Sequence, residues 1–393
     1  MNSQFDEIVK RAGTNSVKWD GREAIFGSET ALPMWVADMD FDHPNTIKQA
    51  LHDLIDSSIL GYAMPSTQLV HAIADWQKER HHMDVTEDNL LFSPGVVGAL
   101  AVCVQALTDP KDGVMIHDPV YTPFASVVES NNRTLYRSPL FIRDGQYKMD
   151  FDHIEHLLST QPIKLFLLSN PHNPGGRVWS KAELIKLVNL CIKYQVKLVS
   201  DEIHSDLVYS SVSMFSPVTL SEGYKDWVIT LHSATKTFNI AGTKLAFYIV
   251  YNEEIKNKLQ FVQSQTEQSH VSTFGMVATE AAFTRSSEWH LGLMQYLEKN
   301  RAVVTDFFEQ ELPTIFYMIP ESTYLFWFDA SALNLKSDEL KDAFIKLGDI
   351  ALNDGQAYGH TSGQFMRLNF ACPTAVLLEG LSRIKKVFDS RTK

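Results

Sequence analysis

Lys236 lies in the sequence Ser-Ala-Thr-Lys-Thr-Phe-Asn at residues 233–239, where its amine could serve more than one kind of chemistry. Paired with Ser233 in S-x-x-K spacing, it could help a serine hydroxyl attack an acyl group. The S-D-N and K-T-G motifs that accompany such a pair are absent from the chain. This argues against an acyl-enzyme and favours a lysine that forms a Schiff base with a carbonyl cofactor.

The run Asp-Glu-Ile-His-Ser-Asp at residues 201–206 offers side chains of the types that bind metal ions. However, the chain has neither an H-E-x-x-H motif nor a pair of closely spaced cysteines. A strand would also point Asp201 and Glu202 to opposite faces. His153 and His156 are expected on an exposed helix. We therefore predict that the protein has no metal site.

A lysine Schiff base suits pyridoxal phosphate, and residues of the types that this cofactor needs are present. Asp201 follows an apolar run, Val-Lys-Leu-Val-Ser, and its carboxylate can keep the pyridine nitrogen protonated. The protonated ring then acts as the electron sink. Asn173, in a turn bracketed by prolines, can donate its amide to the phenolate oxygen, and Tyr121 can stack on the ring.

The cofactor's phosphate has a predicted binding site where Ser-Pro precedes Gly95. Gly95 opens a helix at this point, and the free backbone N–H groups around Val96 and Val97 can bind an anion. Ser233 can add a hydroxyl group, and Lys244 a positive charge. Each of these residues is weak evidence alone, but together they supply every contact that the cofactor requires.

These polar residues share a position, because each follows a run of strand-like residues. From residue 94 onward, short apolar runs alternate with amphipathic helical patterns, which predicts strands separated by helices. The predicted strands are 113–117, 164–169, 196–200, 227–231 and 245–250. Asp118 to Tyr121, Asn170 to Asn173, Asp201 to His204 and His232 to Lys236 follow four of them. In a parallel sheet the carboxyl ends of strands meet at one edge, where sites collect.

Strands that alternate with helices predict an α/β architecture with a mostly parallel sheet covered on both faces. Residues 253–308 read as nearly continuous helix, broken around His270 and Ser286. Further strands are expected at 324–328 and 364–369, and helices at 338–347 and 375–388. We predict an N-terminal segment (1–50) that mostly joins the small domain, a large cofactor-binding domain (51–285) and a small α+β domain (286–393).

Composition narrows the possible partners. The 393 residues carry a formal net charge of -12 and include no run of basic residues, so nucleic acid and anionic membranes are poor candidates. Leu245 to Tyr251 is too short an apolar run to span a membrane, and the N-terminus does not resemble a secretory signal. We therefore expect a cytoplasmic protein. The three cysteines are far apart, and Cys103 is expected in the core.

The sequence also resembles a known family, the fold-type I pyridoxal-phosphate enzymes. Within the class I/II aminotransferase superfamily it is most similar to the carbon–sulfur lyases of the MalY/PatB type. The resemblance covers essentially the whole chain. Its motifs here are LPMWVADMDF (32–41), GY (61–62), DPVY (118–121), SNPHNPGGRVW (169–179), DEIHSD (201–206), SATKTFN (233–239) and FMRLN (365–369).

The resemblance implies that Lys236 holds the cofactor as the internal aldimine and that Asp201 and Asn173 contact its ring. It also implies that Arg367 binds the substrate α-carboxylate, for which a planar guanidinium is suited. Tyr62 would reach the phosphate bound to a neighbouring subunit, so a homodimer with shared active sites is implied. The remaining residues expected at the site are His204 near the cofactor, and Ala37 and Tyr358 near the substrate.

Two positions depart from the common aminotransferase pattern. His204 stands where those enzymes commonly have tyrosine, as in the lyase branch, and Lys244 stands where they commonly have arginine. The loop 352–359 also lacks the proline-glycine pair expected before the carboxylate-binding strand.

The expected activity is β-elimination from cystathionine, cystine or S-substituted cysteines, which yields a thiol, pyruvate and ammonia. It would belong to sulfur amino acid metabolism and methionine biosynthesis. In this mechanism Lys236 removes the Cα proton, and Lys236 or Tyr121 protonates the leaving thiolate. An aminotransferase with the same residues is the main alternative, and a cofactor-binding regulatory protein is a second.

Overall fold

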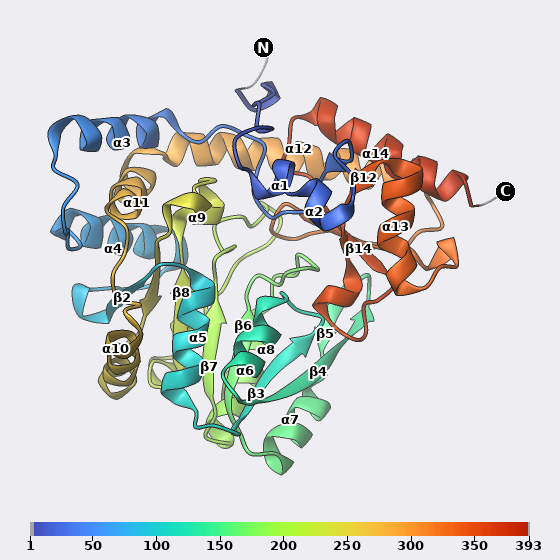
Figure 1. Ribbon diagram of the computed structural model, residues 1–393. Coiled ribbons are helices and arrows are strands. Elements are labelled where there is room, and N and C mark those ends of the chain that lie inside the picture. Colours follow the sequence, from blue (N-terminus) through green and yellow to red (C-terminus); the bar gives the residue numbers. More distant parts are fainter. Residues whose placement is uncertain (1–3, 392–393) are drawn as a thin grey trace.

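A computed structural model describes residues 4–391. Its centre is an eight-stranded sheet in the order β2-β9-β8-β7-β6-β3-β4-β5 (Figure 1). Strands β8, β7, β6, β3 and β4 are parallel, whereas β2, β9 and β5 run antiparallel to their neighbours. The strands are β2 (Leu90–Ser93), β3 (Gly113–Asp118), β4 (Thr134–Arg143), β5 (Gln146–Met149), β6 (Ile163–Ser169), β7 (Lys197–Asp201), β8 (Val228–His232) and β9 (Ala246–Ile249).

Helices cover both faces of this sheet, because alternate residues of the central strands are apolar on both sides. In β6, for example, Leu165 and Leu167 pack on one face, while Phe166 and Leu168 pack on the other. One face is covered by α5 (Val96–Leu107), α6 (Pro123–Ser130) and α10 (Glu253–Thr266). The other is covered by α4 (Thr67–His81), α7 (Phe151–Thr160), α8 (Lys181–Lys193) and α11 (Thr273–Arg285). The predicted α/β fold class is therefore confirmed.

A second, antiparallel sheet is formed by the C-terminal part of the chain, in the order β10-β11-β14-β13. The strands are β10 (Tyr317–Met318), β11 (Leu325–Asp329), β13 (Asn353–Asp354) and β14 (Phe365–Asn369). The helices of this part are α12 (Ser287–Glu311), α13 (Ser337–Gly348) and α14 (Thr374–Asp389). The breaks predicted near residues 270 and 286 separate α10, α11 and α12.

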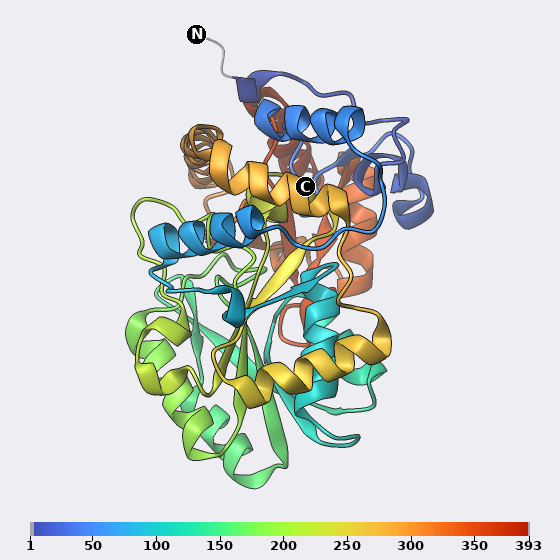
Figure 2. The same ribbon diagram turned by 90° about the vertical axis from the view of Figure 1, so that its left-hand side faces the viewer.

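Of the N-terminal elements, α1 (Val17–Asp20), α2 (Arg22–Phe26) and β1 (Leu32–Pro33) lie against this second part of the chain (Figure 1), whereas α3 (Asn45–Ser57) packs on α11. Strand β1 pairs in parallel with β12 (Ile350–Ala351), while α11 lies between α3 and α4 (Figure 2). The proposed division at residues 50 and 285 stays a prediction, and its outermost residues, 1–3 and 392–393, lie outside the described part.

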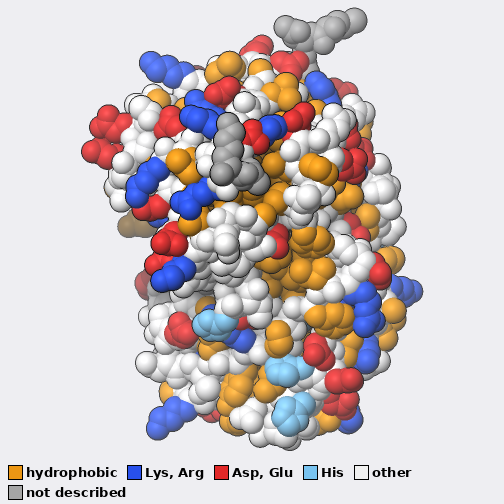
Figure 3. Space-filling model, turned by 90° about the vertical axis from the view of Figure 1, so that its right-hand side faces the viewer, with side chains coloured by type: hydrophobic (Ala, Val, Ile, Leu, Met, Phe, Trp, Pro, Cys, Tyr) orange, Lys and Arg blue, Asp and Glu red, His pale blue; other side chains and the backbone are white. Residues whose placement is uncertain are grey.

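The structure also contains elements that the sequence pattern did not predict. β4 and β5 form a hairpin at one edge of the sheet, and Pro139 interrupts the alternation that would have marked β4. All three cysteines are buried, including Cys103 as expected. Within residues 4–391, no helix combines the length and apolar character needed to cross a bilayer. Acidic and basic side chains are interspersed on the face shown in Figure 3, with apolar side chains gathered near its middle.

Candidate active site

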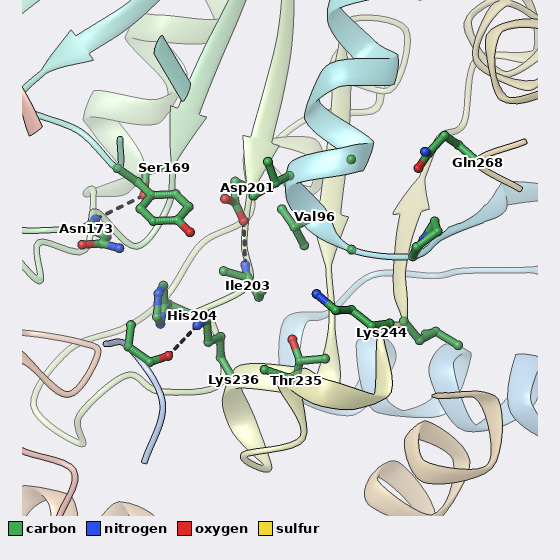
Figure 4. A pocket seen from close by; sticks show the side chains of 18 residues that line it. Val96, Ser169, Asn173, Asp201, Ile203, His204, Thr235, Lys236, Lys244 and Gln268 are labelled. Carbon is green, nitrogen blue, oxygen red and sulfur yellow. Dashed lines mark hydrogen bonds between the residues drawn. The ribbon is translucent and has the colours of Figure 1, made fainter. Parts of the chain in front are cut away.

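The site is a cavity of about 440 Å³ at the carboxyl ends of β6, β7 and β8 (Figure 4). These strands are parallel neighbours, so the loops that follow them converge at one edge of the sheet. Helix α5 contributes its N-terminal end to the same cavity. The lining comprises Ala37, Pro94, Gly95, Val96, Val97, Gly98, Tyr121, Ser169, Asn173, Asp201, Ile203, His204, Thr235, Lys236, Ala241, Lys244, Leu245 and Gln268.

Asp201 is the last residue of β7 and places its carboxylate against the cavity (Figure 4). One carboxylate oxygen accepts a hydrogen bond from the backbone N–H of Ile203 at 3.1 Å. Burial raises the pKa of Asp201 to about 7, although this bond and the nearby Lys236 both favour the charged form. A positively charged group in the cavity would relieve the cost of burying this carboxylate.

Lys236 lies on the short helix α9 (Ala234–Thr237), whose N-cap is Ser233. Its Nζ donates to the carbonyl oxygen of Ala37 at 2.5 Å. Burial lowers the pKa of Lys236 to about 8, an effect that Arg367 reinforces and that nearby Asp38 and Asp201 oppose. About a tenth of the amine is therefore uncharged at pH 7, far more than for an exposed lysine, and this form can act as a nucleophile or a proton acceptor.

Arg367, in β14, reaches the site from the second sheet. Its Nη1 donates to Asn173 Oδ1 at 3.0 Å, and its Nη2 donates to the carbonyl oxygen of Trp35 and to Asn353 Oδ1. The Tyr358 ring lies 5.0 Å from the guanidinium carbon. The Nε–H is buried and has no acceptor, so it is free for a ligand. A carboxylate is the natural partner for this donor.

The opposite end of the cavity is suited to a dianionic group. Gly95 is the N-cap of the twelve-residue helix α5, so free N–H groups face this end. Lys244 and Thr235 line the same end and offer a charge and a hydroxyl (Figure 4). A Cβ on Gly98 would lie 3.1 Å from Gln268 Oε1, so this position has little room for a larger residue.

His204 and Tyr121 line the cavity between these two ends. His204 Nδ1 is buried without a hydrogen-bond partner, and burial lowers the pKa of the ring to about 3. The imidazole is therefore neutral. Burial raises the pKa of Tyr121, so its phenol is protonated at neutral pH. Neither side chain carries a charge that would compete with Asp201 or Lys236.

Four predicted site residues do not line the cavity, and one of them, Arg367, reaches it through its hydrogen bond to Asn173. Ser233 does not face the phosphate end, because its hydroxyl donates to the carbonyl oxygen of Leu245 at 2.6 Å and caps α9. Thr235 lines the cavity in its place. Tyr358 packs beneath Arg367, and Tyr62 is fully exposed on the segment between α3 and α4.

Sequence reasoning missed Thr235, Gln268 and Tyr324. Thr235 lies within the SATK motif and could have been found there, since it follows the same strand end as Lys236. Gln268 follows a helix and carries no motif. Tyr324 was expected only as the first residue of a strand, yet its hydroxyl donates to the carbonyl oxygen of Ala37 at 3.0 Å.

A separate group of His81, Asp206 and His232 has side chains suited to metal binding. The Asp206 carboxylate, however, accepts hydrogen bonds from Trp76 Nε1, His81 Nε2 and Thr237 Oγ1 at 2.8–3.0 Å. These bonds satisfy most of its lone pairs. Burial opposes the charge, but the His81 hydrogen bond and the nearby His232 and His290 lower the pKa of Asp206 well below its usual value. We interpret the group as a buried hydrogen-bond network that joins α4 to α9.

A lysine amine with a lowered pKa, a buried carboxylate, an anion-binding helix end and a buried arginine together define a site for a phosphorylated carbonyl cofactor and a carboxylate substrate. The sequence model of the family described as aminotransferase class I and II matches residues 32–384. The chain belongs to this family.

Individual relatives match over nearly their full lengths. The cystathionine beta-lyase PatB of Bacillus subtilis is 41% identical over 381 residues, which cover 97% of this chain and 98% of the relative. Protein MalY of Escherichia coli is 30% identical, with 96% and 97% covered. The PLP-bound C-S lyase from Staphylococcus hominis superposes with a TM-score of 0.92 at 33% identity, covering 99% of this chain and 98% of that structure.

The residues present fit pyridoxal phosphate, which is the cofactor of this chain. The fit rests on atoms that lack partners within the described residues. Asp201 is a buried carboxylate without a cation in direct contact, the α5 N-terminus has free N–H groups, and Arg367 Nε lacks an acceptor. Asn173 Oδ1 is engaged by Arg367, which leaves the Asn173 NH₂ group to donate to a ligand oxygen.

Proposed function

We propose that this chain is a pyridoxal-phosphate-dependent carbon–sulfur β-lyase. It would cleave cystathionine, cystine or S-substituted cysteines to a thiol, pyruvate and ammonia. The observation that carries this proposal is the 41% identity to a cystathionine beta-lyase across almost the whole chain. The cavity supports it, because an amine with a pKa of about 8 lies near an arginine with a free buried donor.

In this proposal the chain holds the cofactor through contacts at both ends of the cavity. Lys236 would bind it covalently, and Asp201 would pair with its ring nitrogen. Asn173 would donate to its phenolate oxygen, while Tyr121 and the neutral His204 would be the side chains nearest its ring. Gly95, Val96 and Val97 would hold the phosphate, and Thr235 and Lys244 line the same end of the cavity. When bound, the cofactor supplies an electron sink for the pair of electrons left on the substrate Cα.

The remaining chemistry falls to the side chains around the substrate. Arg367 binds the α-carboxylate through its free Nε–H and so fixes which Cα bond faces Lys236. Ala37 would flank the substrate, while Tyr358 would support Arg367 from beneath. The amine of Lys236 takes the proton from Cα as a general base. The Cβ–S bond then breaks, sulfur leaves with the electron pair, and Lys236 or Tyr121 supplies its proton. Water then releases pyruvate and ammonia from the remaining three carbons.

An aminotransferase would use the same residues but would need a keto acid to complete its cycle. Purified holoenzyme should therefore be incubated with cystathionine in the absence of any keto acid. We expect continuous release of pyruvate, with one thiol formed per pyruvate. If pyruvate does not form and turnover appears only after a keto acid is added, the chain is an aminotransferase and the lyase proposal is wrong.

The role of Lys236 can be tested without turnover. Borohydride should fix the cofactor to the wild-type protein, and peptide mass spectrometry should find the added mass on Lys236. The Lys236→Ala variant should show no such adduct. Lys244→Ala, which removes another amine from the same cavity, should still be labelled on Lys236. A cofactor adduct that persists in Lys236→Ala would disprove the assignment.

We further propose that the protein acts as a homodimer with shared active sites. The segment between α3 and α4 exposes four apolar or aromatic side chains, namely Ile59, Leu60, Tyr62 and Met64, which are 97%, 55%, 111% and 82% exposed. Such a cluster is costly in water, and a second copy of the chain would cover it. Tyr62 would then reach the phosphate end of the partner's cavity. Light scattering should give twice the chain mass of 44.5 kDa, and a monomer at micromolar concentration would refute this.

We also propose that the protein acts in the cytoplasm, in a step of sulfur amino acid metabolism that serves methionine biosynthesis. Fractionation of cells that carry a tagged copy would test the location. Recovery of the full-length protein in the membrane or secreted fraction would contradict it.

A further inference from the structure

The segment Trp35–Met39 runs beside the cavity, and each of its five backbone carbonyl groups accepts a hydrogen bond from a side chain. Arg367 donates to Trp35, and Asn369 donates to Val36 and Asp38. Met39 accepts from Arg11 and Asn239. These donors come from the N-terminal segment, from β14 and from the loop after α9, so the segment is held from several sides.

The carbonyl group of Ala37 differs from the other four. Ala37 is the only one of these five residues that lines the cavity. Its oxygen accepts from Lys236 Nζ at 2.5 Å and from the Tyr324 hydroxyl at 3.0 Å. A carbonyl oxygen has two lone pairs, so it can accept both bonds at once. Tyr324 is only 1% exposed, and its ring packs edge-on against His204 at 6.1 Å.

We propose that Tyr324 is a positioning residue that acts on Lys236 through the carbonyl oxygen that the two side chains share. Tyr324 fixes where this acceptor lies, and thereby where the amine rests when it is not bonded to the cofactor. It also competes for the oxygen, so that Ala37 holds the ammonium form less tightly than an unshared carbonyl would. The inference rests on the proposed function only for its catalytic consequence.

The sign of the effect follows from the direction of the Tyr324 hydroxyl. Its O–H points its positive end at the Ala37 oxygen, and therefore toward the ammonium group of Lys236. Removing the hydroxyl removes this repulsion, and the Ala37 oxygen then accepts a hydrogen bond from Lys236 only. Both changes stabilise the charged amine, so the pKa of Lys236 should rise. The other charged or titratable groups around Lys236 stay in place in such a variant: Asp38 before α3, Asp201 in β7, His204 and Tyr121 in loops, and Arg367 in β14.

A purely structural role for Tyr324, tying the N-terminal segment to β11, is the alternative. Tyr209 provides a matched control, because it is equally buried and donates its hydroxyl to the carbonyl oxygen of Thr323 at 2.6 Å. Tyr209→Phe therefore removes the same kind of bond one residue away from Tyr324, without touching Ala37. If the hydroxyl is only structural, Tyr324→Phe and Tyr209→Phe should lose similar amounts of stability and leave Lys236 unchanged. If Tyr324 acts on Lys236, only Tyr324→Phe should change the pKa of Lys236.

The experiment is competitive labelling of the full-length, cofactor-free protein with a trace of acetic anhydride between pH 6 and 10. Peptide mass spectrometry then gives the pH midpoint for Lys236. We expect a midpoint near 8 in the wild type, and a midpoint about half a pH unit higher in Tyr324→Phe, as one shared hydrogen bond predicts. Tyr209→Phe should match the wild type. Tyr324→Met, which fills the same space without a hydroxyl, should show the same rise if the Phe variant folds poorly.

In the holoenzyme, Lys236 is a free amine only while substrate occupies the cofactor, so the acid limb of the kcat profile should move in the same direction. Half a pH unit predicts about a threefold loss at pH 7 and no difference above pH 9.5. Equal labelling midpoints in all three proteins, or an equal shift in Tyr209→Phe, would overturn the inference. Labelling needs no substrate, so a wild type that labels as expected but releases no pyruvate would refute the lyase proposal alone.

Discussion

Replacing Asp201 with asparagine should stabilise the cofactor-free protein, even though it removes a residue that we propose to bind the cofactor. Burial raises the pKa of Asp201 from 3.8 to about 7. At 1.36 kcal/mol per pKa unit, keeping this carboxylate charged costs the folded protein on the order of 4 kcal/mol. Asparagine carries no charge, and its side-chain oxygen can still accept the hydrogen bond from Ile203.

The added stability of Asp201→Asn should depend on pH. Because the folded pKa of Asp201 is the higher one, between pH 3.8 and 7 the folded protein keeps a proton that the unfolded chain releases. Wild-type stability therefore falls as pH rises through this window, by up to about 1.4 kcal/mol per pH unit. The advantage of Asp201→Asn should be near zero at pH 4, grow until pH 7, and stay constant above.

Urea unfolding of the cofactor-free protein at pH 5, 6, 7 and 8 measures this difference. Asp206→Asn is the control, because this second buried aspartate is stabilised by donors from Trp76, His81 and Thr237. All four pH values lie above the pKa that Asp206 has in the unfolded chain. Asp206→Asn should therefore lower the free energy of unfolding by the same amount, about 3 kcal/mol, at each of them. The reasoning is refuted if Asp201→Asn gives no stabilisation at pH 8, or the same stabilisation at pH 5 and pH 8.

Adding pyridoxal phosphate should make the wild-type protein more stable than Asp201→Asn, which reverses their order in the cofactor-free state. In the proposed function the protonated ring nitrogen pairs with Asp201, so the cost of the buried charge becomes an attraction. Wild-type protein should then gain more in thermal midpoint than Asp201→Asn on cofactor addition, and should lose cofactor more slowly during dialysis. Equal gains for both proteins would remove Asp201 from the cofactor site.

Two further substitutions test the substrate end of the cavity and the contact between the two parts of the chain. Arg367→Lys should raise KM for cystathionine about 10-fold or more, because the charge-assisted hydrogen bond from the free Nε–H is worth about 1.5–3 kcal/mol; steady-state pyruvate release checks this, and an unchanged KM contradicts it. In Gly359→Ala the new Cβ would lie 2.0 Å from Asp118 Oδ1. Thermal unfolding should show a loss of about 2–3 kcal/mol, whereas Gly223→Ala, whose nearest neighbour is 3.9 Å away, should cost less than about 1 kcal/mol.

The large sheet and its edge of functional residues could be predicted because they depend on local patterns. Parallel strands and the helices between them are marked by apolar runs, and the residues after each strand must meet at one edge. Lys236, Asp201 and Asn173 meet there as expected, although their roles remain proposals. The edge hairpin β4–β5 was missed because its alternation is interrupted by Pro139.

The rest of the site depends on contacts between distant parts of the chain. Ser233 was predicted to bind phosphate because serine suits that role, but serine before a short helix also makes a good N-cap, and the structure uses it so. Tyr324 has no sequence motif. Its importance follows from the carbonyl group of Ala37, which lies 287 residues away along the chain. No periodicity or spacing within one segment could reveal such a pair.

The path of residues 35–39 also has a consequence for synthesis of the protein. The acceptor of Lys236 precedes it by 199 residues, and Arg367, which holds Trp35, follows that residue by 332. At about 5–20 residues per second, a ribosome needs roughly 10 to 40 s to reach Lys236 after Ala37, and roughly 17 to 66 s to reach Arg367 after Trp35. Residues 35–39 therefore lack these hydrogen-bond partners during this time. Incomplete chains are therefore expected to be inactive, so that the reactive amine is placed for chemistry only after nearly all of the protein has been made.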